Sequence, residues 1–449
     1  MKFNHTTDRQ LFLAAKEQLI LPPRDLIDAL TGPALILTRS KETRGVVEQR
    51  QLKKEEIDAD LKQFSLQGLA PDMVILRALN AGICGSDMKN AFGKECRYGY
   101  EPGRALLHEA SAVVVRVGSA VHEVTAGDLV VANPLFPDPD GIGFQTGAPQ
   151  CDGEATFASI QKHGFAREFF LYPAALVHKV NPDKTSPALA ALAEPLACVF
   201  QALEGYGAIT KRIQARSLDA VGPKNTSYNY TVLILGGGAL GMTTALVAKY
   251  LGAKEVIVLD RNRSKTEKIN SLGDGIRGLC IDWEKTTEGR EREKKCAELH
   301  EVIREVARGN FQQRKGVDML VNCVDSPQAI SDHLPALYGS PEPVVIQAGG
   351  SQGGLELSAP LFRKLMTQSA TMLWSYRYSP ASLRTAIHFL EQAPDEAAKL
   401  LISLTGAWEQ QNQGALQAFN ASYTRTSGAG KYQVAFSRVG DLQERFEGN

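Results

Sequence analysis

The sequence predicts an α/β chain with two architectures, a mainly β domain followed by a doubly wound parallel sheet. Residues 111–131 are rich in apolar and β-branched side chains and are interrupted by glycine turns, which is typical of short joined strands. Residues 231–260 instead show a buried-type strand, a glycine turn, a helix and a second strand, the pattern of one βαβ unit. The change of pattern predicts two separate domains.

Length and composition allow this organisation. The 449 residues suffice for two or more units with cores of their own, and 43% hydrophobic with 22% charged residues is ordinary for a soluble globular protein. The formal net charge is zero, so neither nucleic acid nor a membrane surface is an expected partner. The N-terminus has no signal-peptide core, and we expect no apolar run long enough to span a bilayer. The seven cysteines, an odd number, are widely scattered and do not form the pattern of a disulfide framework. We therefore expect a reducing compartment, the cytoplasm.

The first part of the chain is expected to begin with an extension, residues 1–32. A Pro-, Gly- and Asp-rich stretch, 133–153, predicts a long irregular loop, and a helix is expected from Pro187 to Tyr206. Alternating or continuous apolar runs predict the strands. These strands are expected within 34–37, 73–79, 111–131 and 169–180.

A polar insertion, 211–230, is expected to precede the parallel sheet, and the charged stretch 284–308 is predicted to be a surface helix. Strands of this sheet are predicted at 231–235, 255–260, 317–322 and 343–348, with a helix at 239–251 and a late strand at 432–436. We therefore divide the chain into an extension (1–32), a β-rich domain (33–205), a parallel-sheet domain (206–360) and a C-terminal segment (361–449).

Three glycines after the strand at 231–235 have the spacing G-x-G-x-x-G of a dinucleotide-binding turn. Gly236 permits the tight turn, Gly238 lets the backbone approach a pyrophosphate, and Gly241 lets helix and strand pack closely. Ala239 and Leu240 open the helix, whose free N–H groups would face the phosphates. The glycines alone are weak evidence; their position between a strand and a helix strengthens the prediction.

Asp260 ends the next strand, 19 positions after Gly241, where a carboxylate can bind the ribose hydroxyls of the cofactor. A carboxylate there repels a 2′-phosphate and favours NAD over NADP, although Arg261 and Arg263 keep NADP open. The alternative for Asp260 is a simple turn residue. The predicted cofactor-binding residues are Gly236, Gly238, Ala239, Leu240, Gly241, Asp260, Arg261 and Cys323.

Separate segments of the first domain carry the ligand types of an open zinc site, namely thiolate, imidazole and carboxylate. They contain Cys84, the pair His108-Glu109, and Glu194. Each has an ordinary alternative: a buried apolar cysteine, a hydrogen-bonded core pair, and an acidic residue in the first turn of a helix. A Lewis-acid metal together with a nicotinamide cofactor predicts hydride transfer between an alcohol and a carbonyl substrate.

The order of these motifs resembles that of the zinc-dependent medium-chain dehydrogenases, the alcohol dehydrogenase-like family, nearest its sorbitol and sugar-phosphate branch. The motifs are Gly82–Asp87, His108-Glu109 followed by Val117-Gly118, Gly127–Val130, Glu194-Pro195-Leu196 and the glycine turn. The likeness covers roughly residues 34–438. It implies a GroES-like catalytic domain completed by the C-terminal segment, with a Rossmann domain between, in a homodimer or homotetramer.

The resemblance also implies roles by position. Cys84 and His108 would be zinc ligands, Glu109 would bind the metal or stand just behind it, and Glu194 would act directly or through a water. Ser86 would relay the alcohol proton, so the implied catalytic residues are Cys84, Ser86, His108, Glu109 and Glu194. Asp87 would orient His108, a common device at zinc sites.

The sequence departs from the family pattern at three places. Leu107 and Ala112 stand where the family usually has glycine, and both add bulk near the metal loop. The region that holds four cysteines in many relatives supplies only Cys151, which excludes a Cys₄ structural zinc. One catalytic zinc is therefore expected.

Our leading hypothesis is an NAD-dependent zinc dehydrogenase for a secondary alcohol of a polyol, sugar or sugar phosphate. The alternatives are a zinc-free NAD(P)-dependent reductase of the same fold and a catalytically silent nucleotide-binding protein. Lys94, Arg97 and Arg104 lie between two ligand segments and are candidates for binding a substrate phosphate, with solvated loop charges as the alternative.

Overall fold

The computed structural model divides the chain into two compact units. The β-rich unit comprises residues 1–194, 383–427 and 431–449, and the parallel-sheet unit comprises 195–382 and 428–430. Their boundaries fall at 194/195 and 382/383, whereas the sequence places them at 205/206 and 360/361. The structure describes residues 6, 8–10, 12–14, 30–38, 46–57, 64–65, 68–92, 101–209, 230–281, 289–308, 316–340, 342–348, 355–401, 416–420 and 430–436.

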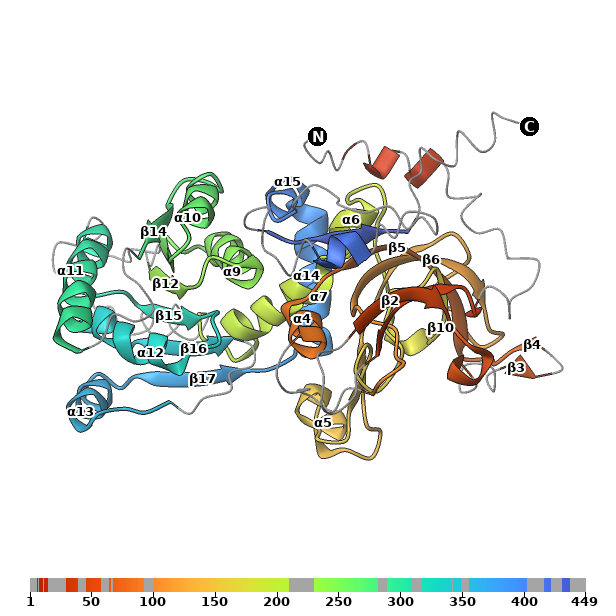
Figure 1. Cartoon of the computed structure of the whole chain (residues 1–449), viewed down its shortest axis with the longest axis horizontal. Helices are drawn as coiled ribbons and strands as arrows, with labels where there is room; N and C mark the ends of the chain where they lie inside the picture. The colour runs from red at the N-terminus through yellow and green to blue at the C-terminus, as the bar shows by residue number, and fades with distance from the viewer. Residues whose placement is uncertain are drawn as a thin grey trace, which may run out of the picture. The chain divides into compact units, whose positions relative to one another are not determined.

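An antiparallel sheet forms the centre of the β-rich unit, in the order β10-β5-β6-β7-β11. Figure 1 labels its strands β5, β6 and β10. Its strands are β5 (Met73–Gly82), β6 (Glu109–Val117), β7 (Leu129–Ala132), β10 (Phe169–Pro173) and β11 (Val177–Lys179). The late strand β18 (Gln433–Ala435) pairs with the end of β5, at Asn80–Gly82. The C-terminal segment therefore returns to this unit and completes its sheet.

The continuous apolar pattern of β5 follows from burial on both of its faces. Val74 and Leu76 point into one hydrophobic core, whereas Met73 and Ile75 point into another, because side chains alternate along a strand. The hairpin of β1 (Pro33–Thr38) and β2 (Val46–Gln51) contributes to both cores in the same alternating manner.

Short elements connect these strands. The stretch 133–153, expected to be an irregular loop, contains three of them. The elements are η1 (Lys54–Ile57), β3 (Phe64–Ser65), β4 (Gly68–Leu69), α4 (Gly85–Phe92), β8 (Leu135–Phe136), α5 (Ile142–Gln145), η3 (Pro149–Cys151), β9 (Thr156–Phe157), η4 (Ala174–Leu176), α6 (Pro187–Ala190), α14 (Pro380–Gln392) and α15 (Pro394–Ala398).

The parallel-sheet unit has the strand order β14-β13-β12-β15-β16-β17, with every neighbouring pair parallel. Numbered along the chain, this is the order 3-2-1-4-5-6 of a doubly wound dinucleotide-binding sheet. The strands are β12 (Thr231–Leu235), β13 (Glu255–Asp260), β14 (Ile276–Cys280), β15 (Met319–Asn322), β16 (Val344–Ala348) and β17 (Thr371–Ser375). The predicted fold class, a β-rich domain with a doubly wound sheet, is confirmed.

Helices connect the strands of this sheet. The predicted charged helix appears as α11, which begins at Gly289, while the start of the predicted stretch and the insertion 211–229 lie outside the described residues. The helices are α7 (Ala193–Phe200), η5 (Gln201–Gly205), α9 (Ala239–Tyr250), α10 (Arg263–Asn270), α11 (Gly289–Arg308), α12 (Pro327–His333), η6 (Leu334–Leu337) and α13 (Ala359–Thr367).

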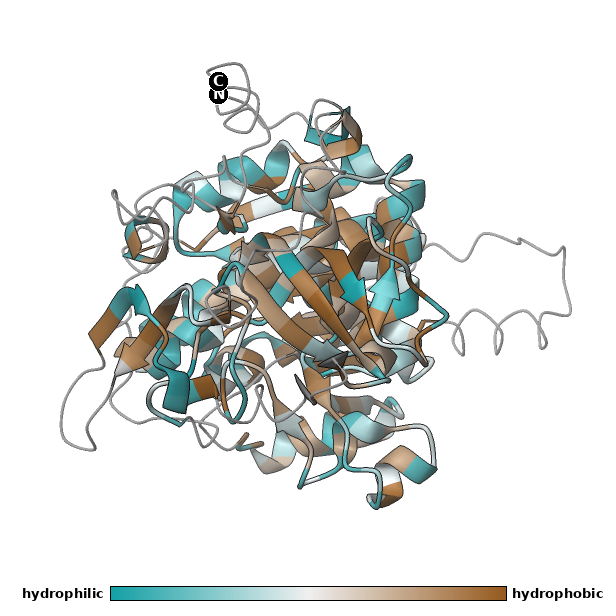
Figure 2. Cartoon of the chain, turned by 90° about the vertical axis from the view of Figure 1, so that its right-hand side faces the viewer, coloured by the Kyte–Doolittle hydropathy of each residue, from teal (hydrophilic) through white to brown (hydrophobic). Residues whose placement is uncertain are grey.

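The single helix predicted over 187–206 is divided into α6, α7 and η5. By length and composition alone, Pro187–Gly205 is apolar enough to cross a membrane, which corrects the expectation that no such run exists. However, 83% of this stretch is buried inside the protein, as is typical of a core helix. Figure 2 shows that hydrophobic residues predominate along the strands, whereas many helices contain both hydrophobic and hydrophilic residues.

Candidate active site

Three of the four predicted metal ligands lie together in the β-rich unit. One potential donor atom from each of Cys84, His108 and Glu109 falls within 4.8 Å of the others. The register of β5 and β6 explains why these three residues lie together. Glu109 is the first residue of β6 and pairs with Gly82, the last residue of β5. Cys84 follows Gly82 by two positions, and His108 directly precedes Glu109. A thiol, an imidazole and a carboxylate from two chain segments thus converge at one end of the sheet.

The carboxylate of Glu109 has the surroundings of a cation ligand. Its side chain is completely buried, and Oε2 has no hydrogen-bond partner among the described residues. A Cβ at Gly82 would lie 2.1 Å from Oε2, so a larger residue there would displace the Glu109 carboxylate. A buried carboxylate oxygen without a partner costs free energy unless a cation binds it. The residues present therefore fit a metal ion.

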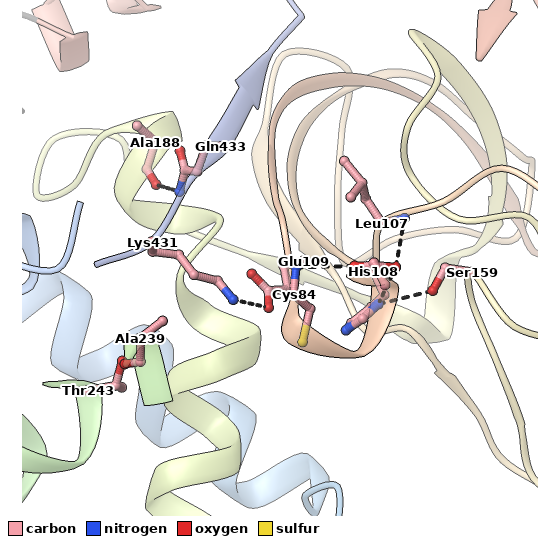
Figure 3. Close-up of polar contacts among 11 residues, drawn as sticks. Cys84, Leu107, His108, Glu109, Ser159, Ala188, Ala239, Thr243, Lys431 and Gln433 are labelled. Carbon is pink, nitrogen blue, oxygen red and sulfur yellow. Dashed lines mark hydrogen bonds and ion pairs between the residues drawn. The ribbon is translucent and has the colours of Figure 1, made fainter. Parts of the chain in front are cut away.

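Lys431 is a site residue that sequence reasoning missed. Its ammonium is buried and forms an ion pair with Oε1 of Glu109. Burial lowers the pKa of Lys431, but Glu109, Cys84 and Glu194 together raise it above its ordinary value, so the side chain stays charged. The only signal in the sequence is a lysine immediately before the apolar late strand. Figure 3 shows Lys431 reaching Glu109 from the C-terminal strand.

His108 is held through its Nδ1 atom. Ser159 Oγ lies 3.0 Å from Nδ1, and Asp87 Oδ1 lies 3.5 Å from the same atom. Burial lowers the pKa of His108, but Asp87 and Cys84 oppose this and raise it well above its usual value. Asp87 lies where the resemblance expects an orienting group, and it also accepts the backbone N–H of Cys84 at 3.1 Å.

Glu194, the fourth predicted ligand, lies in the first turn of α7 and is buried. Burial raises the pKa of Glu194 to about 7, with His108 and Lys431 acting in the opposite direction. These influences place Glu194 in the electrostatic neighbourhood of the cluster, but it is not among the residues whose donor atoms converge. Ser86 lies in the first turn of α4 and is partly exposed.

Only one of the three candidate phosphate-binding residues can be placed. Arg104 forms an exposed ion pair with Glu101 at 2.6 Å. This pairing supports the alternative of a solvated loop charge. Lys94 and Arg97 lie outside the described residues.

Leu107 adopts a left-handed backbone, with φ at 65°, at the position where the family usually has glycine. A non-glycine residue in this region costs about 1–2 kcal/mol. Its side chain is completely buried in the core that also contains Ala112. The hydrophobic core therefore accommodates the side chains of both Leu107 and Ala112, which replace glycines of the family pattern.

Replacing Leu107 should reveal this backbone strain. Leu107→Ala loses core packing, about 2–5 kcal/mol of unfolding free energy, and keeps the strained φ. Leu107→Gly loses slightly more packing but relieves the strain, so we expect it to be no less stable than the alanine variant. Leu106, equally buried with an ordinary φ, is the matched control, and there glycine should be less stable than alanine by about 1 kcal/mol. Equal alanine-to-glycine differences at both positions, measured by denaturant unfolding, would contradict the strain.

The predicted cofactor residues gather at one end of the parallel sheet. Gly236 has φ at 97°, and a Cβ at Gly241 would lie 1.7 Å from the Gly236 carbonyl oxygen, so both glycines are required. A Cβ at Gly238 would meet no atom within 4 Å, which leaves open space before the first turn of α9. This arrangement is the one expected for pyrophosphate at a helix N-terminus.

Asp260 holds the glycine turn from the end of β13. Its Oδ2 accepts the N–H of Gly237 at 2.8 Å and lies 3.5 Å from Lys265 Nζ. Arg261 follows it and is exposed. The carboxylate is thus both a turn residue, as in the alternative, and a group beside the expected cofactor turn.

Cys323 follows β15, and its N–H donates to Leu235 O at 2.9 Å. Burial raises the pKa of Cys323 to about 12, so the thiol stays neutral. The predicted residues therefore lie beside the neighbouring strands β12, β13 and β15, where the strand order reverses direction. Ligands bind at this position in open parallel sheets.

Comparison with known proteins adds to this geometry. Residues 70–182 match the alcohol dehydrogenase GroES-like domain. Human sorbitol dehydrogenase is 29% identical over 218 residues, which cover 48% of this chain and 56% of that enzyme. The match thus spans less than two thirds of this relative's length.

Solved structures resemble almost the whole fold. Galactitol-1-phosphate dehydrogenase from Escherichia coli has 20% sequence identity and a TM-score of 0.66, covering 90% of this chain and 100% of that chain. Glucose dehydrogenase from Haloferax mediterranei, solved with NADP, zinc and gluconolactone, has 20% identity and a TM-score of 0.63 over 90% of this chain and 99% of that chain. At these identities the likeness establishes the fold.

The GroES-like β-rich unit and the doubly wound sheet define the two-domain architecture of alcohol dehydrogenase-like proteins. The chain contains an alcohol dehydrogenase GroES-like domain, and its fold is that of the medium-chain dehydrogenases/reductases to which it is similar.

Proposed function

We propose that the protein is a zinc-dependent dehydrogenase that moves a hydride between NAD and a secondary alcohol of a polyol, sugar or sugar phosphate. The observation that carries the proposal is the convergence of Cys84 with the buried His108 and Glu109, where one carboxylate oxygen has no hydrogen-bond partner among the described residues. The similarity to sorbitol dehydrogenase supports the polyol class.

Cys84, His108 and Glu109 would hold the metal in this proposal, and Glu194 would act from its buried position nearby. Bound zinc would polarise the substrate oxygen, and bound NAD would exchange the hydride. Asp87 keeps the Cys84 backbone and the His108 ring in place. Ser86, partly exposed, would pass the alcohol proton toward solvent.

NAD is preferred over NADP in this proposal because the carboxylate of Asp260 lies beside the glycine turn, where it would repel a 2′-phosphate. Lys265 near the carboxylate and the exposed Arg261 weaken that repulsion. We therefore expect a preference for NAD rather than exclusion of NADP. The scattered cysteines support a cytoplasmic location.

We also propose a homodimer formed through the edge strand β17, which has a neighbour on one side only among the described strands. Large apolar side chains are exposed on β17, on the neighbouring α13 and just after the strand: Phe362 at 58%, Met366 at 61%, Trp374 at 65% and Tyr376 at 46%. A second copy can pair with the same strand about a two-fold axis, which satisfies its backbone groups and covers this patch.

Charges in this patch should separate the subunits. We expect Met366→Lys/Trp374→Lys to halve the molar mass measured by light scattering, since two lysines would face their copies across the interface. Ile142→Lys, another exposed apolar residue at 74%, is the control and should leave the mass unchanged. An unchanged mass in the double variant would contradict the dimer through β17.

The activity itself is tested by NAD reduction with a panel of polyols, sugars and sugar phosphates, using protein with and without added zinc. Turnover that requires zinc, with NAD used better than NADP, is the expected result. Zinc-independent turnover would indicate the metal-free reductase. Dinucleotide binding without turnover on any substrate would indicate the silent binder.

A further inference from the structure

We infer that Ser159 is a positioning residue for His108, which fixes the imidazole so that Nε2 is the nitrogen available to the metal. The inference rests on the proposed function, because it concerns how a metal ligand is held. Ser159 lies in the loop after β9, 51 residues from His108 in the chain, and its side chain is buried.

The contact with Ser159 is the shorter of two at His108 Nδ1. Ser159 Oγ lies 3.0 Å from Nδ1, whereas Asp87 Oδ1 lies at 3.5 Å. The same Asp87 carboxylate also accepts the N–H groups of Cys84 at 3.1 Å and Leu107 at 3.4 Å. The Asp87 carboxylate is thus shared among the N–H groups of Cys84 and Leu107 and the His108 ring, whereas Ser159 is the closer partner of His108 Nδ1.

Asp87 determines the direction of the hydrogen bond to Ser159. A carboxylate beside Nδ1 favours a proton on that nitrogen, so Nδ1–H donates to Ser159 Oγ. Nε2 then carries the lone pair, as a metal ligand must. The Asp87 carboxylate thus selects the tautomer, and the two contacts at Nδ1 together limit rotation of the ring.

Hydrogen bonds and a ring contact fix the loop that carries Ser159. The carbonyl oxygen of Phe157 accepts the N–H groups of residues 160, 161 and 162, at 3.2, 3.1 and 3.2 Å. The Phe157 ring packs against the imidazole of His108 in a T-shaped contact, with centroids 5.3 Å apart. In Figure 3, Ser159 and Lys431 approach the three ligand residues from opposite sides.

The backbone of Ser159 gives an independent indication. Its φ of 66° lies in the left-handed region, where a non-glycine residue costs about 1–2 kcal/mol. Glycine would remove this strain but has no hydroxyl. A strained residue whose side chain contacts a ligand residue is the pattern from which a functional role is inferred.

The test uses the full chain after chelation, titrated with Co²⁺ and followed by thiolate-to-cobalt absorption. Ser159→Ala removes the hydroxyl and keeps the strained backbone; Ser159→Gly removes the hydroxyl and relieves the strain. We expect both variants to bind Co²⁺ roughly 10–100-fold more weakly and to shift its absorption bands. Ser111→Ala, which removes a buried hydroxyl with no hydrogen-bond partner in the described part of the chain, is the control and should match the wild type.

The outcomes separate this inference from the proposed function. Wild-type affinity and unshifted bands in both Ser159 variants would overturn the role of Ser159 and leave the metal site standing. Weaker binding in Ser159→Ala alone would also overturn it, because backbone strain rather than the hydroxyl would then be responsible. A wild-type chain that binds no Co²⁺ would overturn the metal function and the inference together.

Discussion

Cys84→Ala is expected to abolish metal binding and turnover together while dinucleotide binding stays intact. The thiol supplies one of three converging donors, and a site with only an imidazole and a carboxylate is a poor zinc site. The glycine turn that would bind the dinucleotide belongs to the other compact unit. Metal content, NAD-linked turnover and NAD binding by calorimetry, measured on one preparation, check the three parts of this expectation.

The matched control for Cys84→Ala is Cys151→Ala, because Cys151 belongs to the same unit but is exposed. It should retain wild-type metal content and turnover. Normal turnover in Cys84→Ala would refute the assigned site. Loss of NAD binding in this variant would instead indicate damage beyond the metal ligands.

Lys431→Met is expected to lower the free energy of unfolding of the metal-free protein by about 3–5 kcal/mol. The substitution leaves the buried Glu109 carboxylate without its charged partner. Added zinc should recover part of this loss, since a cation on the carboxylate replaces the missing ammonium. Denaturant unfolding with chelator and with zinc measures both effects.

Two further variants test the cause of this loss. Glu109→Gln/Lys431→Met removes both charges and should be more stable than Lys431→Met alone, because no unpaired charge remains. Lys399→Met removes a partly exposed lysine that pairs with Glu396 at 2.7 Å, and it should cost less than about 1 kcal/mol. Equal losses for Lys431→Met and Lys399→Met would contradict the buried pair.

The sequence predicts the parallel-sheet unit well because its signals are local. The strand β12, the glycine turn and the helix α9 follow one another within 20 residues of chain, 231–250, and each has its own pattern. In contrast, the sequence does not predict the strand β14. Its sequence IRGLC contains a charged residue and a glycine, which interrupt the apolar pattern of a buried strand. The domain boundaries also differ because α7 and α14 continue through them without a break in the helical pattern.

The metal ligands could be proposed from motifs, but their supporting residues could not. Lys431 lies 322 residues from Glu109, and long-range contacts such as the pairing of β18 with β5 bring it there. Ser159 sits in an ordinary-looking segment, and its role depends on a left-handed φ that sequence patterns do not reveal. Leu107 could be recognised as a departure, but its backbone strain and its burial are properties of the fold.

Zinc per chain, measured by elemental mass spectrometry on protein purified without chelators, tests the central claim most directly. We predict about one zinc per chain in the wild type, as expected for a single catalytic site, and none in Cys84→Ala. A wild-type chain without zinc, even after zinc is offered back, would contradict the proposed mechanism.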